Sequence, residues 1–456
     1  MHLEVAMYAR RLSIYSVKFA CVALLLVAQA WPQEKISKSD RDLAQDMLQV
    51  VQKDVRQHYY DPKLHGLDWD ARVAEEKQKI DKADSMSMAL SKIAGLLDSL
   101  NDSHTFFLPP QRTNRYDYGW QYQMIGERCF VTRVRPKSDA EAKGVKPGDE
   151  ILALDGYVPN RDNLWKMQYV YAVLRKQPMV QLELQDPAGQ QRQVDVAARI
   201  RQHKTVVNLN EGDDRDVFWQ RHEQLLRARY ADFGDQLIVV KLPEFGSSVA
   251  EVQTVVKKVR KYPAMIVDLR GNPGGSVESL KSLVGGVFDK EVKIADRVGR
   301  KESKPEIAKP SHNPFSGKLV VLVDARSASA AEIFARIVQL EKRGMVIGDH
   351  TSGSVMESED YYETMGTTAG ILTRGSMSVL GAPIFYGASI TEWNLVMADG
   401  KSLEHTGVIP DEIALPSAKD LASGNDPVMA RAAELLGVKL SADQAGKLFP
   451  YEWAPE

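Results

Sequence analysis

The sequence of 456 residues contains only two cysteines, Cys21 and Cys129. Cys21 lies in an N-terminal segment that we expect to be removed, and it lacks the small-residue context of a lipoprotein site. The mature chain then keeps a single thiol, which excludes an internal disulfide. Because no residue beside Cys129 would activate a thiolate, the sequence predicts a buried cysteine and not a catalytic one.

The sequence also lacks a dominant charge of one sign. Lys and Arg total 59 against 61 Asp and Glu, and the basic residues are scattered along the chain. Proteins that bind nucleic acid concentrate basic residues on one face or stripe, so we do not expect nucleic acid as a partner. The 44% hydrophobic and 26% charged residues are typical of a globular protein, without internal repeats or low-complexity tracts.

Long hydrophobic runs are missing too. The apolar run FACVALLLVA is too short to span a bilayer; it follows the basic residues Arg10 and Lys18 and precedes the small-residue pattern AQA at 28–30. This order predicts a signal peptide over residues 1–30. We therefore expect an exported protein, periplasmic or extracellular, with no stable membrane span after cleavage; the alternative is an uncleaved N-terminal anchor.

The length of the chain exceeds one ordinary hydrophobic core, so we expect more than one domain. Helical spacing of apolar residues predicts a helical segment at 31–116, with a loop HYYDPKLHGLDWD between its helices. Short alternating strands predict a β-rich domain at 117–200. From 201 to 456, strands alternating with helices predict an α/β domain with a mostly parallel sheet. A charged helical linker is expected at 213–230, and a last helical segment at 418–447.

The stretch VVLVDARSASAAE at 320–332 has the pattern of a buried strand, a tight turn and a helix start. A serine at such a turn projects its hydroxyl above the sheet, toward the free N–H groups of the following helix. Ser329 therefore has the setting of a nucleophile. The alternative is that Ser327 or Ser329 is only the N-cap of the helix, which is the usual role of serine at this position.

A glycine loop, GNPGG, follows the apolar strand AMIVDLR. Active sites form at the carboxyl ends of parallel strands, and both this loop and the serine turn have that position. Gly274 and Gly275 lack side chains, so their N–H groups can approach a carbonyl oxygen and form an oxyanion hole with the N–H of Ala330. A phosphate-binding loop is the rival interpretation, but neither GxGxxG nor GxxxxGK[ST] occurs.

The helical segment ends in LNDSHTFFLPP, which places His104 at a corner of the chain. Imidazole is a candidate general base at neutral pH, although a single histidine at a helix end is more often structural.

Within the β-rich region, AEAKGVKPGDEILALDG contains Gly144 and Gly148 at turns and a strand that ends at an Asp-Gly turn. This motif resembles a PDZ domain. The resemblance implies a groove that adds a peptide as an extra strand and captures its C-terminal carboxylate on backbone N–H groups. The carboxylate loop would fall at residues 118–120; a PDZ fold kept only as a spacer is the alternative.

Together these motifs resemble the C-terminal-processing, or tail-specific, serine peptidases and their relatives, the tricorn-type proteases. DSHT, the PDZ-like insert, VDLRGNPGG, SASAAEIF, GDHTSG and GVIPD occur in the family's order between about Arg41 and Ile413. The resemblance implies an α/β catalytic domain of the crotonase-like type. It also implies that Ser329 is the nucleophile and that Gly274 or Gly275, with Ala330, supplies the oxyanion N–H groups.

One departure from the family concerns the base. Many members use a lysine in a TFGKG segment, whereas this chain has TSGSV, with Ser354 in the lysine position. The tricorn-type branch instead uses a histidine from DxHT and a glutamate near GVxPD, which correspond to His104 and Glu404. Ser103 also resembles the tricorn arrangement, in which that hydroxyl assists. The resemblance therefore implies a Ser-His-Glu mechanism, with Glu392 as the competing carboxylate.

We therefore expect an exported serine endopeptidase that cleaves unfolded or tailed polypeptides through an acyl-enzyme, with no metal or organic cofactor. His350 and His405 match nothing in the family pattern, and we expect both at the surface. The alternative is a non-catalytic protein that binds peptides or lipids on the same scaffold, as the retinoid-binding relatives do.

Overall fold

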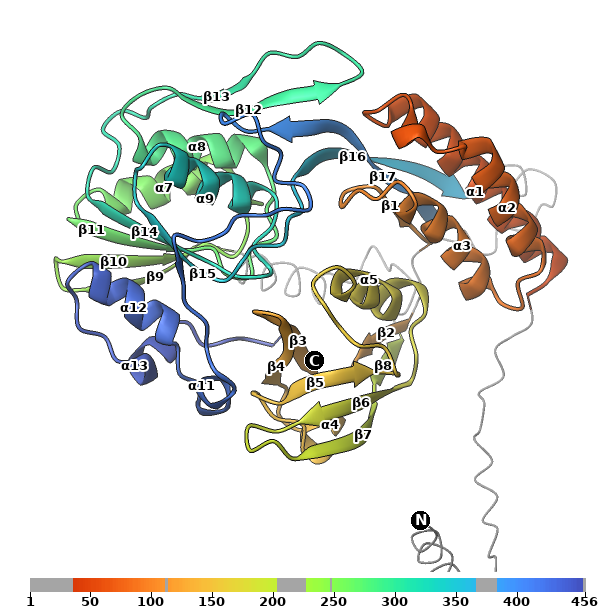
Figure 1. Cartoon of the computed structure of the whole chain (residues 1–456), viewed down its shortest axis with the longest axis horizontal. Helices are drawn as coiled ribbons and strands as arrows, with labels where there is room; N and C mark the ends of the chain where they lie inside the picture. The colour runs from red at the N-terminus through yellow and green to blue at the C-terminus, as the bar shows by residue number, and fades with distance from the viewer. Residues whose placement is uncertain (1–35, 111–113, 203–226, 247, 366–383, 454–456) are drawn as a thin grey trace, which may run out of the picture.

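The computed structural model describes residues 36–110, 114–202, 227–246, 248–365 and 384–453. The expected signal peptide and most of the expected linker lie outside these ranges. Figure 1 shows a helical part on one side, an α/β part on the other and a small β-rich part below, with long strands between the first two. Within the described ranges, every helix is either too short or too polar to cross a membrane.

The N-terminal part consists of the helices α1 (Lys38–His58), α2 (Trp69–Asp81) and α3 (Met86–Asp98). Helix α2 lies within the predicted helical segment, and only its first two residues, Trp69 and Asp70, fall in the predicted loop. It begins where the Asp68 carboxylate accepts the N–H of Ala71 at 3.1 Å, which is N-cap geometry. The loop therefore ends slightly earlier than predicted, where α2 begins.

The β-rich part is a five-stranded antiparallel sheet in the order β3-β4-β5-β6-β7. Strand β3 lies at its edge and pairs only with β4 among the described strands. Cys129 on β4 is 2% exposed, and burial raises the pKa of its thiol to about 12, so the prediction of a buried cysteine is confirmed. The elements of this part are β2 (Asn114–Asp117), β3 (Trp120–Ile125), β4 (Arg128–Val134), α4 (Asp139–Ala142), β5 (Glu150–Leu154), α5 (Leu164–Tyr169), η2 (Val170–Leu174), β6 (Met179–Gln185), β7 (Gln191–Ala197) and β8 (Arg199–Gln202).

The α/β part has a six-stranded sheet in the order β18-β15-β14-β11-β10-β9. All neighbours pair in parallel except β9, which is antiparallel to β10, so the prediction of a mostly parallel sheet is confirmed. Arg229 and Tyr230 belong to β9, so the linker prediction was wrong at its end. The strands are β9 (Arg229–Phe233), β10 (Leu237–Lys241), β11 (Ala264–Asp268), β14 (Lys318–Val323), β15 (Met345–Gly348) and β18 (Glu412–Ile413).

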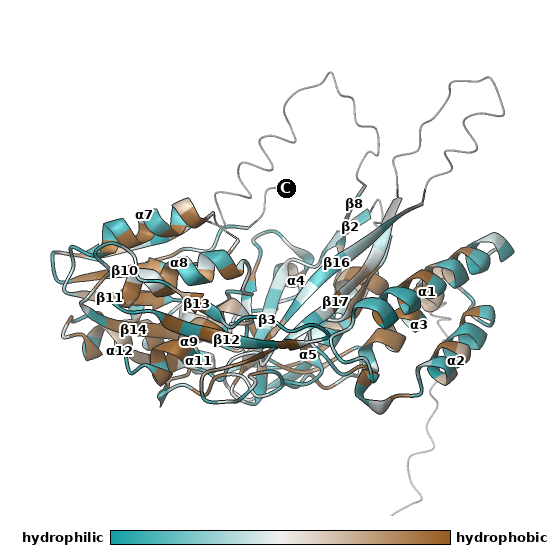
Figure 2. Ribbon diagram, turned by 90° about the horizontal axis from the view of Figure 1, so that it is seen from above, coloured by the Kyte–Doolittle hydropathy of each residue, from teal (hydrophilic) through white to brown (hydrophobic). Residues whose placement is uncertain are grey.

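Helices cover both faces of this sheet. Alternate residues of β14, such as Val321 and Val320, enter two different hydrophobic clusters, one with the helices α7 to α9 and one with α12. A strand buried on both faces is continuously apolar, which explains the run VVLV. Figure 2 shows the brown strands between helices that carry teal residues on their outer faces. The helices are α7 (Val249–Val259), α8 (Val277–Val287), α9 (Ala330–Leu340), α11 (Ala418–Ser423), α12 (Pro427–Leu435) and α13 (Ala442–Gly446); the last three confirm the predicted C-terminal helical segment.

A second sheet joins the α/β part to the N-terminal helices. Its central strand β17 pairs with β1 around Ala388 and with β12 around Asn394. Ala388 and Ile390 are buried in the same cluster as α1 and α3. This sheet therefore fixes the DSHT corner, just before β1, relative to the α/β part. Its strands are β1 (Phe106–Leu108), β12 (Val292–Gly299), β13 (Glu306–Ala308), β16 (Met356–Met365) and β17 (Ile384–Val396).

Candidate active site

Ser329 occupies the turn between β14 and α9, as the sequence predicts. Its backbone has φ 53° and ψ −118°, a left-handed conformation that is unfavourable for any residue except glycine. Ser329 is partly exposed, whereas Ser327 is buried and its hydroxyl donates to the carbonyl of Leu269 at 2.9 Å. Of the two serines, Ser329 is therefore the one that solvent and a substrate can reach.

The glycine loop packs directly against this turn. A Cβ on Gly274 would lie 2.6 Å from Ser329 Cβ, so only glycine permits this approach. The loops are also bonded, since the N–H of Ala328 donates to the Asn272 carbonyl at 2.9 Å. The N–H of Gly274 already donates to Asn272 Oδ1 at 2.8 Å. This leaves Gly275 and Ala330 as the better placed donors for an incoming oxyanion.

Glu332 holds the serine turn in place. Its carboxylate is completely buried and accepts the N–H of Ser329 at 3.0 Å. It also accepts the N–H groups of Gly353 at 2.7 Å and Ser354 at 3.0 Å, and the hydroxyl of Thr351 at 2.5 Å. Burial raises the pKa of Glu332 to about 7, against the opposing effect of these donors. One carboxylate thus ties the candidate nucleophile to the TSGS segment.

His104 lies in a turn that a second buried carboxylate organises. Asp102 Oδ1 accepts the N–H groups of His104 at 2.8 Å and Thr105 at 2.9 Å. The hydroxyl of Thr391, on β17, donates to the same oxygen at 2.7 Å. These bonds connect the turn to the central strand of the second sheet and fix the backbone that carries the imidazole.

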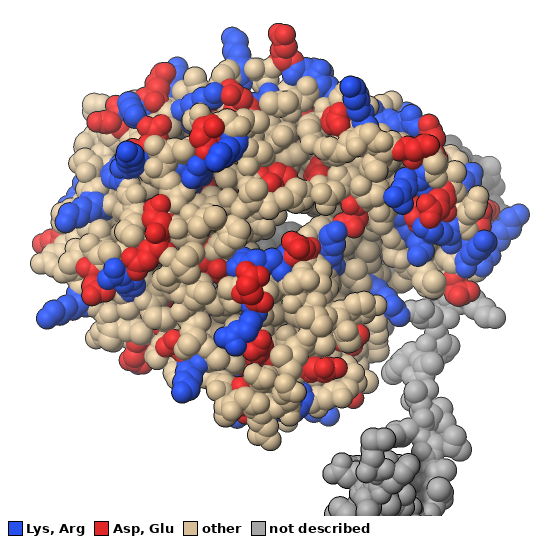
Figure 3. All heavy atoms as spheres, viewed as in Figure 1, with Lys and Arg blue, Asp and Glu red and all other residues tan. Residues whose placement is uncertain are grey.

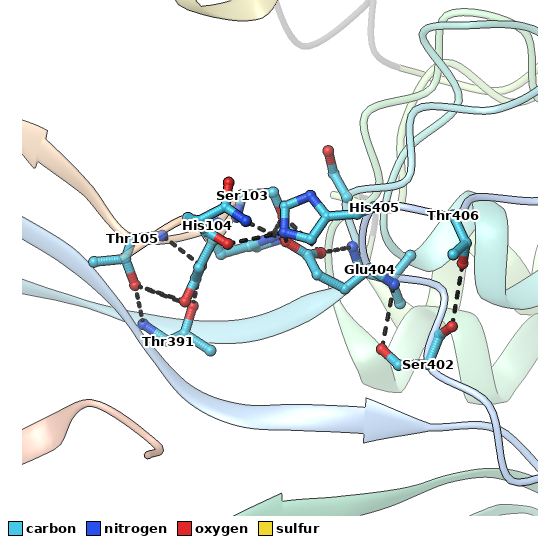
Figure 4. A network of polar contacts seen from close by, with 12 residues as sticks. Ser103, His104, Thr105, Thr391, Ser402, Glu404, His405 and Thr406 are labelled. Carbon is cyan, nitrogen blue, oxygen red and sulfur yellow. Dashed lines mark hydrogen bonds and ion pairs between the residues drawn. The ribbon is translucent and has the colours of Figure 1, made fainter. Parts of the chain in front are cut away.

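Ser103 lies between His104 and Glu404 (Figure 4). The Ser103 hydroxyl donates to Glu404 Oε2 at 2.9 Å and contacts His104 Nδ1 at 2.8 Å. Because the hydroxyl proton is directed to the carboxylate, Nδ1 must be the protonated nitrogen that donates to Ser103, which leaves Nε2 unprotonated. Glu404 also accepts the N–H of Ser103 at 2.8 Å, so the carboxylate reaches the imidazole through Ser103 and not directly.

The competing carboxylate and the other histidines make different contacts. Glu392 accepts a hydrogen bond from Tyr361 and lies 3.7 Å from His58 Nδ1. His350 contacts the carbonyl of Thr406 at 2.6 Å. His405 contacts the Asn101 carbonyl at 2.8 Å, and its Nε2 is 3.6 Å from Glu404. None of these contacts involves the His104 ring.

A short segment joins the serine turn to the histidine turn. The N–H of Ser329 donates to the Ser354 carbonyl at 2.9 Å, and the N–H of the next residue, Val355, donates to Glu404 Oε2 at 2.8 Å. The structure therefore connects Ser329, Glu404 and His104, which are far apart in the sequence, through one chain of hydrogen bonds. Ser354 contributes its backbone carbonyl to this connection.

A cleft of about 610 Å³ opens beside this chain of bonds. Ser103 and the residues 351–354 line one side, and Leu164 and Trp165 from the β-rich part line the other. The space-filling view shows an opening near the centre of this face, bordered by acidic and basic side chains (Figure 3). The cleft is large enough for a few residues of an extended polypeptide.

Sequence interpretation missed three residues of this site. Glu332 had a visible signal, because Ser329 and a glutamate three residues later form the pattern of a capping box. Asp102 precedes a turn, where aspartate commonly accepts backbone N–H groups. Asn272 had no signal of its own. Among the described residues, no cluster of His, Cys, Asp or Glu has the arrangement of a metal site.

Part of the chain matches a known protein family. Residues 236–413 match the model of Peptidase family S41. The chain is 22% identical to the carboxy-terminal processing protease CtpB of Bacillus subtilis over 290 residues, 60% of this chain and 56% of that protein. It is 26% identical to the carboxyl-terminal-processing protease of Picosynechococcus over 350 residues, 72% of this chain and 77% of that one.

Other relatives differ in length. A putative tricorn protease homolog of Streptomyces coelicolor is 24% identical over 433 residues, which is 88% of this chain but 33% of that protein. The chain thus spans from 33% to 77% of the length of these three relatives. Among solved structures, mature CPAF in complex with lactacystin aligns with a TM-score of 0.60 at 15% identity, over 84% of this chain and 96% of that one. This likeness shows a common fold.

Proposed function

Because residues 236–413 match the model of Peptidase family S41, we propose that the chain is a serine endopeptidase whose nucleophile is Ser329 and whose general base is His104. The observation that carries the proposal is the bonded series from the Ser329 turn through Val355 and Glu404 to Ser103 and His104. We further propose that the α/β part is crotonase-like and that the protein acts after export.

In the proposed reaction His104 Nε2 takes the proton of the Ser329 hydroxyl while the oxygen attacks the substrate carbonyl. The N–H groups of Gly275 and Ala330 stabilise the oxyanion, and Gly274 leaves room for it. The imidazolium then protonates the leaving amine, and water releases the acyl group by the same steps in reverse order. Ser103 and the Glu404 carboxylate stabilise the imidazolium, since the positive charge strengthens both hydrogen bonds.

We propose that residues 117–200 form a PDZ domain that presents substrate tails to the cleft. The edge position of β3 supports this, because an unpaired strand edge can accept an extended peptide. Polypeptides with free C-termini are the expected substrates.

An active-site-directed fluorophosphonate tests the proposal. We expect the mature protein to be labelled at Ser329, and peptide mapping would identify the modified residue. Labelling should disappear in Ser329→Ala and persist in Ser327→Ala. A protein that binds polypeptides but resists labelling at Ser329 would instead be a binding protein on the same scaffold.

The acid limb of the pH profile should report His104. Desolvation lowers the pKa of this imidazole from 6.5, while Glu404 and Asp102 oppose the shift. A base with a lowered pKa stays neutral to lower pH, so kcat/KM should be at its plateau at pH 7 and fall only as the pH drops through a midpoint at or below about 6.5. Initial rates on one peptide between pH 4 and 9 measure this. A limb near pH 8 or above, or near-full activity in His104→Ala, would show that another group is the base.

A further inference from the structure

A second cavity, of about 340 Å³, lies between the β-rich part and the α/β part. Ser329 and His104 line neither this cavity nor the first cleft. Its walls come from one face of β3 and β4, from the loops after β11 and β14, and from the C-terminal segment, with Gln123, Arg133, Gly271, Asp324 and Tyr451 as representatives.

Most carboxylates in its wall already have cationic partners. Asp268 pairs with Arg270 at 2.9 Å, and the same guanidinium pairs with Asp426 at 2.7 Å. Asp349 pairs with Arg161 at 2.8 Å. The charges of these carboxylates are therefore already balanced within the protein. They do not balance the charges of the other arginines in the cavity wall.

Three arginines in the wall remain without such a partner. Within the part of the chain that the structure describes, Arg133, Arg229 and Arg326 form no ion pair with a carboxylate, and Nε of Arg229 is buried without an acceptor. The acceptors that Arg133 and Arg229 do have are neutral: Arg133 Nη1 donates to Gln121 Oε1 at 3.3 Å, and Arg229 Nη1 donates to the Pro450 carbonyl at 3.0 Å. The one lining carboxylate left over is Asp324, which accepts the N–H of Gly271 at 2.8 Å. Three guanidinium groups without a carboxylate partner, of which Arg326 is exposed, against one such carboxylate leave an excess of positive charge in the cavity wall.

Aromatic rings of the C-terminal segment compensate only part of this charge. Tyr451 stacks 4.4 Å from the Arg133 guanidinium, and Phe449 lies 5.5 Å from that of Arg229. A ring over the face of a guanidinium attracts the charge but accepts no bond from most of its in-plane N–H groups. Desolvation lowers the pKa of Arg133, and the neighbouring Arg326 and Arg270 add to this effect, whereas Tyr451 and Asp324 oppose it.

We propose that this cavity binds an oxyanion, a carboxylate or a phosphate group, between Arg133 and Arg326. The planar fork of arginine matches both anions by paired hydrogen bonds, and the low dielectric of the cavity strengthens them. The anion is either free in solution or the terminal carboxylate of a peptide. Its position beside Gly271, the first residue of the glycine loop, places it next to the candidate catalytic loops but outside them.

Binding to the full mature chain carrying Ser329→Ala tests this site without any hydrolysis. Three probes are titrated by calorimetry: inorganic phosphate, a short peptide with a free C-terminus, and the same peptide with an amidated C-terminus. We expect phosphate, the free-acid peptide or both to bind. The amide should bind at least about tenfold more weakly than the acid if the peptide is the source of the anion.

Arg133→Gln and Arg326→Gln should each weaken the binding at least about tenfold, because each removes a charged donor. Arg128→Gln is the matched control: Arg128 lies on the same strand as Arg133, but it is exposed and pairs with Glu150 at 3.2 Å. Its affinity should equal that of the parent.

The outcomes separate clearly. Binding of phosphate alone that depends on Arg133 supports a site for a free anion, and binding of the acid peptide that depends on Arg133 supports capture of a peptide end. Absence of binding by all three probes, or binding unchanged in Arg133→Gln and Arg326→Gln, overturns the proposal. Because the measurement uses the Ser329→Ala protein, its result is independent of whether the chain is a peptidase.

Discussion

Replacing Ser329 with alanine is expected to abolish the cleavage of casein and of tailed peptides. The change removes the attacking oxygen, and the loss in kcat should be on the order of a millionfold, the scale known for the nucleophile of subtilisin. The fold should persist, because the turn is surrounded by alanines and the Glu332 carboxylate bonds to the backbone of residue 329, which the substitution keeps. Rates of peptide hydrolysis and the melting temperature, measured on the same preparations, check both statements.

Ser327→Ala is the matched control for this experiment. Ser327 is buried, and its hydroxyl bonds to the carbonyl of Leu269 and accepts the N–H of Asp324. Its loss should lower the free energy of unfolding by about 1–3 kcal/mol and leave most of the activity. Equal activity in Ser329→Ala and the parent, with a normal melting temperature, would refute the proposed reaction.

Glu404→Gln is expected to lower kcat by about a hundredfold and Glu392→Gln to change it little. The Glu404 carboxylate accepts from the N–H of Ser103, the Ser103 hydroxyl and the N–H of Val355. Glutamine supplies one acceptor oxygen in place of two, and its NH2 group would face one of these donors. Ser103 is therefore less well held. The effect should fall short of the roughly ten-thousandfold loss known for a directly bonded carboxylate, because Ser103 separates the glutamate from the imidazole.

Comparing Glu404→Gln with Glu392→Gln also separates an effect on catalysis from an effect on stability. Glu392 bonds to Tyr361 on the neighbouring strand, so Glu392→Gln reports what a similar substitution does to the second sheet. In Glu404→Gln, both kcat for one peptide and the acid-side midpoint of the pH profile should shift, because the imidazolium loses its counter-charge. A large loss of kcat in Glu392→Gln with little change in Glu404→Gln would assign the orienting carboxylate to β17.

Local patterns in the sequence predicted much of this structure. Short stretches of sequence were enough to predict the strand, turn and helix around Ser329 and the glycine loop after β11. Continuous apolar runs indicate buried strands, and glycines indicate tight turns. Strand β9 was missed, since it follows a charged stretch. The parallel order of the sheet followed from the alternation of strands and helices alone.

The connections within the candidate site were beyond such patterns. Ser103 and Glu404 are 301 residues apart, and only the family resemblance related them. The role of Asp102 depends on Thr391, which lies on a strand that local sequence does not pair with the DSHT corner. Buried carboxylates that accept several N–H groups are products of tertiary packing, which no window of sequence contains.

The long strand β17 has a consequence for how the protein can be divided. Its first half is covered by the N-terminal helices, and its second half pairs with β12 beside the α/β sheet, so two sequence segments share one element. A fragment cut after residue 200 would carry Ser329 but not His104, and its copy of β17 would expose an apolar face. The sequence boundaries of the helical and α/β parts are therefore not boundaries of independent stability, and a gene fragment cut between them would lose contacts that β17 needs on both of its halves.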